Sequence, residues 1–143
     1  MTQEQKDLLF KDLCARLPYG VKAYVKHWSN LDRKYYENVY TVKSTFPSLN
    51  EVHVQSETGS VNVILGYTDY VIKPYLFPLE SMTEERKEEF DQLLELELKA
   101  ISDEINHTQA TEFEVDFYHK HHLDWRGLIP KGLAIDATNL NIY

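Results

Sequence analysis

Apolar residues recur along the chain at two different spacings, and the spacing changes near residue 19. In residues 1–18, apolar side chains recur every three or four positions, which predicts an amphipathic helix. Thr2 is the expected N-cap, with Gln5 in the reciprocal capping-box position, and Pro18 ends the helix. Residues 19–72 instead alternate apolar and polar side chains in short segments between turn residues. This alternation predicts four or five antiparallel strands, at residues 21–26, 35–45, 51–57, 61–67 and, for the short fifth, 70–72.

The longest helical pattern follows a segment with two prolines. Pro74 and Pro78 fix their own φ and disfavour helix in the residue before each, so residues 73–83 are predicted to form a stiff, non-helical arm. Thr83 is the expected N-cap of the main helix, over residues 84–105, and Ser81 is the alternative cap. We expect the apolar stripe of this helix to pack on the sheet. The stripe consists of Phe90, Leu93, Leu94, Leu98, Ile101 and Ile105.

The last third of the chain starts with a second capping signal. Thr111 and Glu114 have capping-box spacing, which predicts a short helix over residues 111–122. Residues 123–143 show no sustained period, because Gly127, Pro130 and Gly132 interrupt them, yet they are rich in apolar side chains. We therefore expect an irregular tail that packs back over the core as turns.

These elements predict one α+β domain over residues 1–143, since 143 residues suit a single hydrophobic core. The four or five short strands are expected to form a small, strongly bent antiparallel sheet, similar to an SH3-like half-barrel. The predicted parts are a helix (1–18), the antiparallel sheet (19–72), the proline arm (73–83), the long acidic main helix (84–105), a short helix (111–122) and the packed tail (123–143).

Charge is distributed unevenly along the chain. Of the net charge of −8, residues 80–116 account for −10, because they hold 13 acidic and 3 basic side chains. One interpretation is a solvated outer helix face, and the other is an acidic docking surface for a basic partner or a mimic of nucleic-acid phosphates. Repulsion between like charges excludes binding of DNA or RNA at that face.

Hydropathy and cysteine content narrow the class of protein. No run of 18 apolar residues occurs and the N-terminus lacks a secretory pattern, so we expect a cytoplasmic protein without membrane contact. Cys14 is the single cysteine, which excludes an internal disulfide and a multi-cysteine metal site. We expect its thiol to be packed on the apolar face of the first helix.

The densest group of potential metal ligands lies near the short helix: Asp116, His119, His121, His122 and Asp124. Residues 119 and 121 lie about 200° apart on a helix, so they do not share an ion. Asp116 with His119 supplies only two of the three or four ligands that zinc needs, and His107 is the distant candidate for completing the set. We expect these histidines to cap and pack, and we predict no metal or cofactor.

Two groups are candidates for recognition. Arg126 next to Trp125 could bind a carboxylate or phosphate beside a stacking platform, although an internal Asp124–Arg126 pair that fixes the tail is the other interpretation. The predicted sheet also carries a basic and aromatic region that would suit nucleic acid if it is exposed, and sheet aromatics that are only structural if it is not. Its main residues are Tyr24, Lys26, Lys34 and Tyr36.

Three strings resemble a known family: MTQEQKDLLFKDLCARLPYGVK (1–22), KPYLFPLESMTEERKEE (73–89) and HHLDWRGLIPKGLAIDA (121–137). They are similar to a family of short proteins without an assigned activity that is common in Bacteroidales genomes and in phages and mobile elements of those bacteria. The similarity covers the first 22 residues and the second half, and residues 23–70 differ. It implies a cytoplasmic bacterial protein of prophage or mobile-element origin, and it transfers no catalytic residue.

No glycine-rich phosphate loop and no nucleophile-elbow pattern occurs, so we predict no catalytic residue. The leading hypothesis is a non-enzymatic binding module in which both helices and the proline arm present a variable sheet surface to an unidentified protein partner. The alternative is a nucleic-acid-associated protein that uses the basic aromatic sheet face. A third hypothesis, an enzyme with its site around residues 119–126, requires those side chains to converge in a cleft.

Overall fold

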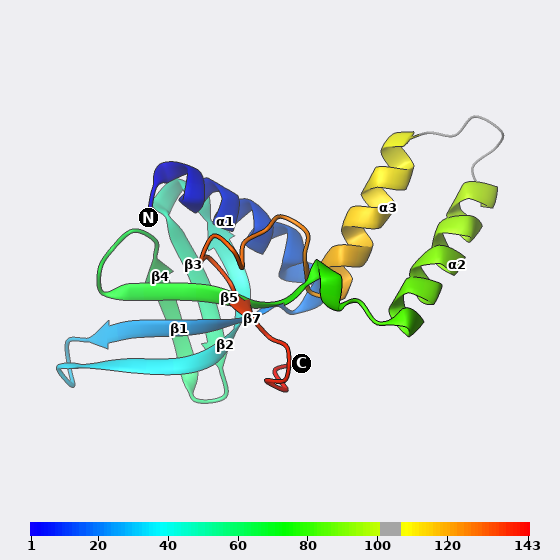
Figure 1. Cartoon of the computed structure of the whole chain (residues 1–143). Coiled ribbons are helices and arrows are strands. Elements are labelled where there is room, and N and C mark those ends of the chain that lie inside the picture. The colour runs from blue at the N-terminus through cyan, green and yellow to red at the C-terminus, as the bar shows by residue number, and fades with distance from the viewer. Residues whose placement is uncertain (101–106) are drawn as a thin grey trace.

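The computed structural model describes residues 1–100 and 107–143 and has an α+β fold (Figure 1). Its helices are α1 (Gln3–Arg16), α2 (Glu84–Ala100) and α3 (His107–Lys120). Its strands are β1 (Lys22–Ser29), β2 (Lys34–Phe46), β3 (Glu51–Ser56), β4 (Gly59–Ile64), β5 (Tyr70–Pro78), β6 (Leu123–Asp124) and β7 (Ile135–Asp136). Single 3-10 turns follow α1, β2 and β5, at Leu17–Tyr19, Pro47–Leu49 and Leu79–Ser81.

The strands form one open, mostly antiparallel sheet with the order β4-β3-β2-β1-β5-β6, and β7 also pairs with β5. The predicted size of four or five strands was wrong, and the SH3-like half-barrel is not confirmed. The two additional strands come from the tail and pair with β5 in parallel. Each has only two residues, which is too short to show the alternation by which strands are recognised in a sequence. The tail otherwise packs as turns, as predicted.

The core lies between α1 and one face of the sheet. Thr2 and Gln5 form the predicted capping box, and α1 turns Leu9, Phe10 and Leu13 toward the strands. The sheet contributes a layer of aliphatic side chains, Val21, Ala23, Val25, Val42, Val52, Val54, Val63 and Ile72, and the tail adds Leu128, Leu133 and Ala134. Burial of each large aliphatic side chain stabilises the fold by roughly 1.5–3 kcal/mol. Cys14 is exposed rather than packed, with its Sγ 2.8 Å from Thr45 Oγ1.

The predicted proline arm is largely strand, because β5 continues through Pro74 to Pro78. Hydrogen bonds between antiparallel strands fall on alternate residues. The Trp28 N–H donates to Asp69 O, and this register turns Lys73 toward β1 and Pro74 away from it. The missing N–H of Pro74 therefore costs no bond to β1, which explains why a proline fits inside the strand.

Helices α2 and α3 form a helical hairpin that projects away from the sheet (Figure 1). The Thr83 hydroxyl accepts the N–H of Arg86, which confirms Thr83 as the cap of α2. Phe90 packs against Phe113, Phe117 and Tyr118 of α3, with ring centroids 4.9–6.2 Å apart. The prediction that the main helix lies on the sheet was therefore wrong, because Phe90 of its stripe packs against aromatic rings of α3.

One boundary of the helical hairpin differs from the sequence prediction, and another falls outside the described residues. Helix α3 begins at His107, so Thr111 lies inside it and does not cap it. Of the predicted stripe on the main helix, Ile101 and Ile105 lie outside the described residues. No helix within the described part of the chain is long and apolar enough to cross a membrane.

Candidate functional site

The strand register divides the exposed sheet residues between two faces. Residues paired across β1 and β2 have numbers that sum to 63, so an even residue of β1 shares its face with an odd residue of β2. Ala23 and Val25 are buried on the face toward α1. The opposite face, here called the open face, carries Lys22, Tyr24, Lys26 and Trp28 of β1, Tyr35, Glu37, Val39 and Thr41 of β2, and Val71 and Lys73 of β5.

Aromatic and basic side chains gather at the outer end of the open face. Trp28 and Tyr35 are cross-strand partners and meet edge to face, with centroids 4.9 Å apart. Lys26 Nζ lies 4.8 Å from the Tyr35 ring and 3.5 Å from a carboxylate oxygen of Glu37. Burial, followed by the neighbouring Glu37, raises the pKa of Tyr24. This surface combines rings, one ion pair and accessible cations, so it suits contact with a polar partner.

The four candidate residues on the sheet do not form one surface. Tyr24 and Lys26 lie on the open face, whereas Lys34 and Tyr36 pair with Ser29 and His27 and lie on the opposite face. Lys34 Nζ is 4.8 Å from the Tyr36 ring, which stacks on His27. The prediction of a single basic aromatic region was therefore wrong, because it counted residues without the register between β1 and β2. Trp28, which it omitted, is part of the surface.

A hollow of about 610 Å³ adjoins the open face where β3 leaves β2. It is lined by residues 38–41 and Lys43 of β2, by Lys22 of β1, and by residues 55–58 at the β3–β4 turn. The Lys22 ammonium donates to Ile142 O, so the end of the chain contacts this rim. Lys22, Lys43 and Glu57 are the charged residues of the lining, which makes the hollow polar with one excess positive charge.

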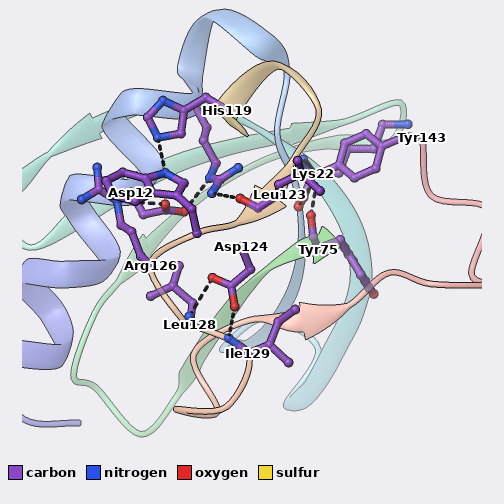
Figure 2. A network of polar contacts seen from close by, with 12 residues as sticks. Asp12, Lys22, Tyr75, His119, Leu123, Asp124, Arg126, Leu128, Ile129 and Tyr143 are labelled. Atoms are coloured by element: carbon purple, nitrogen blue, oxygen red, sulfur yellow. Dashed lines mark hydrogen bonds and ion pairs between the residues drawn. The ribbon is translucent and has the colours of Figure 1, made fainter. Parts of the chain in front are cut away.

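Trp125 and Arg126 belong to a network that ties the tail to α1, and Figure 2 shows Arg126 beside Asp12 of this helix. Asp12 and Arg16 are both fully buried, and Arg16 Nε donates to Asp12 Oδ2 over 2.7 Å. Arg126 Nε lies 3.3 Å from Asp12 Oδ1 without hydrogen-bond alignment, so this contact is an ion pair. The Arg126 guanidinium also stacks 4.2 Å from the Trp125 ring.

The partner predicted for Arg126 was wrong. Asp124 instead accepts the backbone N–H groups of Leu128 and Ile129, over 2.7 and 2.8 Å, and so closes the turn after β6 (Figure 2). Arg126 pairs with Asp12, which lies more than 100 residues away in the sequence and gave no local signal. The sign in the sequence that these charges are buried was the position of Asp12 and Arg16 on the helix face that also carries Leu9 and Leu13.

The three neighbouring histidines point to different partners. His119 Nε2 accepts the Trp125 indole N–H over 3.0 Å, and its pKa is lowered to about 4 by burial and by Arg16. His121 contacts Arg86 and Glu89 of α2. His122 stacks on Tyr143 at 3.7 Å, and burial followed by Arg16 lowers its pKa to about 4. Among the residues with described side chains, no three potential ligands form a metal site; the side chain of His107 is not among them.

His121 lines a second, smaller hollow between the sheet and the helical hairpin. This hollow has a volume of about 240 Å³, and its lining includes the apolar residues Phe77, Met82 and Leu123 as well as Arg86. His119 and Arg126 are not part of its lining. The side chains of residues 119–126 therefore do not converge on one cleft, which is what the enzyme hypothesis required.

Comparison with known proteins adds no assignment to this geometry. No protein-family model, no curated protein and no solved structure matches the chain.

Proposed function

We propose that the protein is a non-enzymatic binding module that holds a protein partner on the open face. The observation that carries this proposal is the partly exposed row of Tyr24, Lys26, Trp28 and Tyr35 on the sheet face opposite α1. Tyrosine and tryptophan are among the residues that dominate the energy of protein interfaces, and three of these four residues are of those types. A surface of this kind on a rigid sheet is preorganised for binding.

The framework of the module differs from the one expected from the sequence. Helix α1, the sheet and the tail hold the open face in place, through the aliphatic core and the Asp12–Arg126 contact. The helical hairpin packs elsewhere, so it is a second surface rather than a support for the sheet. Several acidic residues of α2 are exposed: Glu84, Glu85, Glu88 and Asp91. They are compatible both with a solvated face and with a docking site for a basic partner.

The test compares two faces of the same strand pair. The wild-type chain is immobilised, and the lysate proteins that it retains are measured. Retention is expected to fall by at least about tenfold in the double variant Trp28→Ala and Tyr35→Ala, because each exposed ring contributes on the order of 1 kcal/mol or more to binding. Tyr36→Ala is the matched control, because Tyr36 lies on the opposite face of β2. Equal retention by the wild type, the double variant and the control would exclude the open face as the binding surface.

A second candidate function is association with single-stranded nucleic acid at the same surface. The favouring observation is Lys26 over the Tyr35 ring beside Trp28, since single-strand sites combine cations with rings on which bases stack. Retention on single-stranded DNA at about 50 mM salt, lost steeply as salt increases, would support it. Absence of retention under that condition excludes it.

The biological context is a separate proposal. The resemblance of residues 1–22, 73–89 and 121–137 to a Bacteroidales and phage family supports a cytoplasmic, prophage-derived or mobile-element-derived protein. Sequencing the genes that flank this one in its source genome tests that origin. Flanking genes typical of a bacterial core chromosome, without phage or transfer genes, would contradict it.

A further inference from the structure

Strand β2 is longer than its neighbour β3, and this leaves part of its edge unpaired. β1 pairs with β2 from Lys34 to Thr41, whereas β3 pairs with it from Thr41 to Phe46. Residues 35–39 therefore have β1 on one side and no strand of the described chain on the other. A free edge presents backbone N–H and C=O groups that another strand can bind.

The hydrogen-bond alternation identifies the free groups. The Val42 N–H donates to Val21 O over 3.0 Å, so even-numbered residues of β2 point toward β1. The N–H and C=O groups of Tyr35, Glu37 and Val39 consequently point outward. The Val39 N–H is bound by the side chain of Asn38 over 2.8 Å, in the place where a neighbouring strand would accept it.

The hollow lies at the inner end of this edge. A strand added along residues 35–39 would run collinear with β3, and its alternate side chains would lie on the open face. The innermost of these would reach the hollow beside Lys43, Gln55 and Thr58. Since Lys22 and Lys43 outnumber Glu57 in the lining, a carboxylate is the complementary side chain.

We propose that the free edge of β2 binds an extended peptide by strand addition, with an acidic side chain of the peptide in the hollow. The backbone bonds to residues 35–39 would supply affinity, and the hollow would supply selectivity. This proposal rests on the proposed binding function, and it specifies the class of partner and the mode of binding.

A second copy of the chain fits the same edge less well. Two β2 edges that pair antiparallel through all three outward residues, 35, 37 and 39, place Glu37 directly opposite Glu37 of the copy. Like charges in that position destabilise strand pairing. Self-association is therefore a contrary outcome of the test rather than the expected one.

The probe is a displayed library of random eight-residue peptides, followed by synthesis of the enriched sequences. Enrichment of peptides with at least one acidic residue is expected. Their binding should be at least tenfold weaker to Glu37→Pro, which removes one outward N–H, than to Glu37→Thr, which keeps that N–H and controls for loss of the carboxylate that pairs with Lys26. In the complex, the amide protons of Tyr35 and Glu37 should exchange at least tenfold more slowly than in the free protein.

A peptide-side control covers the case in which Glu37→Pro perturbs the fold. N-methylation of the peptide amides that face β2 should abolish binding, and N-methylation of the alternate amides should not. Peptides that bind equally to Glu37→Pro and Glu37→Thr would overturn strand addition and leave the open-face function intact. Strand addition by a peptide would also be overturned if the library yielded no enriched sequence. The same holds if sedimentation showed a dimer of the protein that Glu37→Pro dissociates. Neither result changes the lysate test of the open face.

Discussion

The sheet and the helical hairpin both display an apolar stripe in the sequence, but they bury it in different ways. The sheet and α1 share an aliphatic core in which residues such as Leu9, Val25 and Val54 are fully buried. In the helical hairpin, Phe90 meets aromatic rings of α3 and stays partly exposed. A hydrophobic period thus predicts that a face is buried, but it does not identify what covers that face. The following experiments test whether these two regions are separate in their energetics.

The largest effect is expected in the charged network that joins α1 to the tail. Asp12→Asn should reduce the free energy of unfolding by about 4 kcal/mol, because it leaves Arg16 and Arg126 buried without a carboxylate. Urea denaturation measures this loss. Asp7→Asn is the matched control, since Asp7 is exposed on the same helix and its loss should cost under about 0.5 kcal/mol. A cost below about 1 kcal/mol for Asp12→Asn would show that packing alone joins α1 to the tail.

Acid should weaken the same junction. The folded pKa of His119 is about 4, whereas its ordinary value is 6.5, because burial and then Arg16 disfavour its charged form while Asp12 and Asp116 oppose the shift. The unfolded chain therefore binds the proton first. The contribution of neutral His119 to the free energy of unfolding is complete above about pH 6.5 and is lost as the pH decreases toward 4. The loss is at most about 1.4 kcal/mol per pKa unit, or on the order of 3 kcal/mol.

Chemical denaturation at pH 7, 6, 5 and 4 measures this dependence. The variant His119→Gln should show a flatter decline, since its side-chain carbonyl can accept the Trp125 N–H without titrating. His122, with the same lowered pKa, supplies the part of the decline that persists. Identical pH profiles for the wild type and the variant would contradict the assignment to His119.

A third experiment tests the separation directly. Phe90→Ala should cost about 2 kcal/mol locally, because Phe90 is only partly buried against Phe113, Phe117 and Tyr118. Hydrogen exchange should accelerate in α2 and α3 while the sheet amides keep their protection. Leu96→Ala is the control, since Leu96 is 62% exposed. Equal acceleration in the sheet would mean that both regions unfold as one unit.

The sequence predicted helix and strand positions well where they depend on interactions between residues a few positions apart. The Thr2 capping box, the Thr83 cap and the turns placed α1, the start of α2 and strands β1 to β4 within a few residues, because these signals act on their own neighbours. The capping-box spacing at Thr111 did not mark the start of α3. The partner of each element could not be predicted in the same way. The contact of Phe90 with α3 depends on how two helices meet, and the Asp12–Arg126 pair joins residues that no sequence spacing relates.

The candidate surface shows the same limit. The sequence identified four basic and aromatic residues on the sheet, namely Tyr24, Lys26, Lys34 and Tyr36. Their division between two faces depends on the pairing of β1 with β2, in which the numbers of paired residues sum to an odd number. A shift of one residue would have placed all four together. Composition therefore identified the kinds of side chain on the sheet, and the pairing of β1 with β2 decided which of them form a surface.

The smallest predicted effect concerns the end of the chain, which joins the tail to the sheet. The Tyr143 hydroxyl donates to Tyr75 O over 2.8 Å and accepts the Lys22 N–H over 3.0 Å, and burial raises its pKa to about 12. Tyr143→Phe removes both bonds but keeps the ring on His122, so it should cost about 1 kcal/mol in urea denaturation. Tyr67→Phe, at a residue that is 65% exposed, should cost almost nothing. Because the Tyr143 hydroxyl bonds to the backbone of β1 and β5, the loss should appear in global unfolding of the sheet and leave exchange in the helical hairpin unchanged. A loss confined to the helical hairpin would place the tail with α2 and α3 instead.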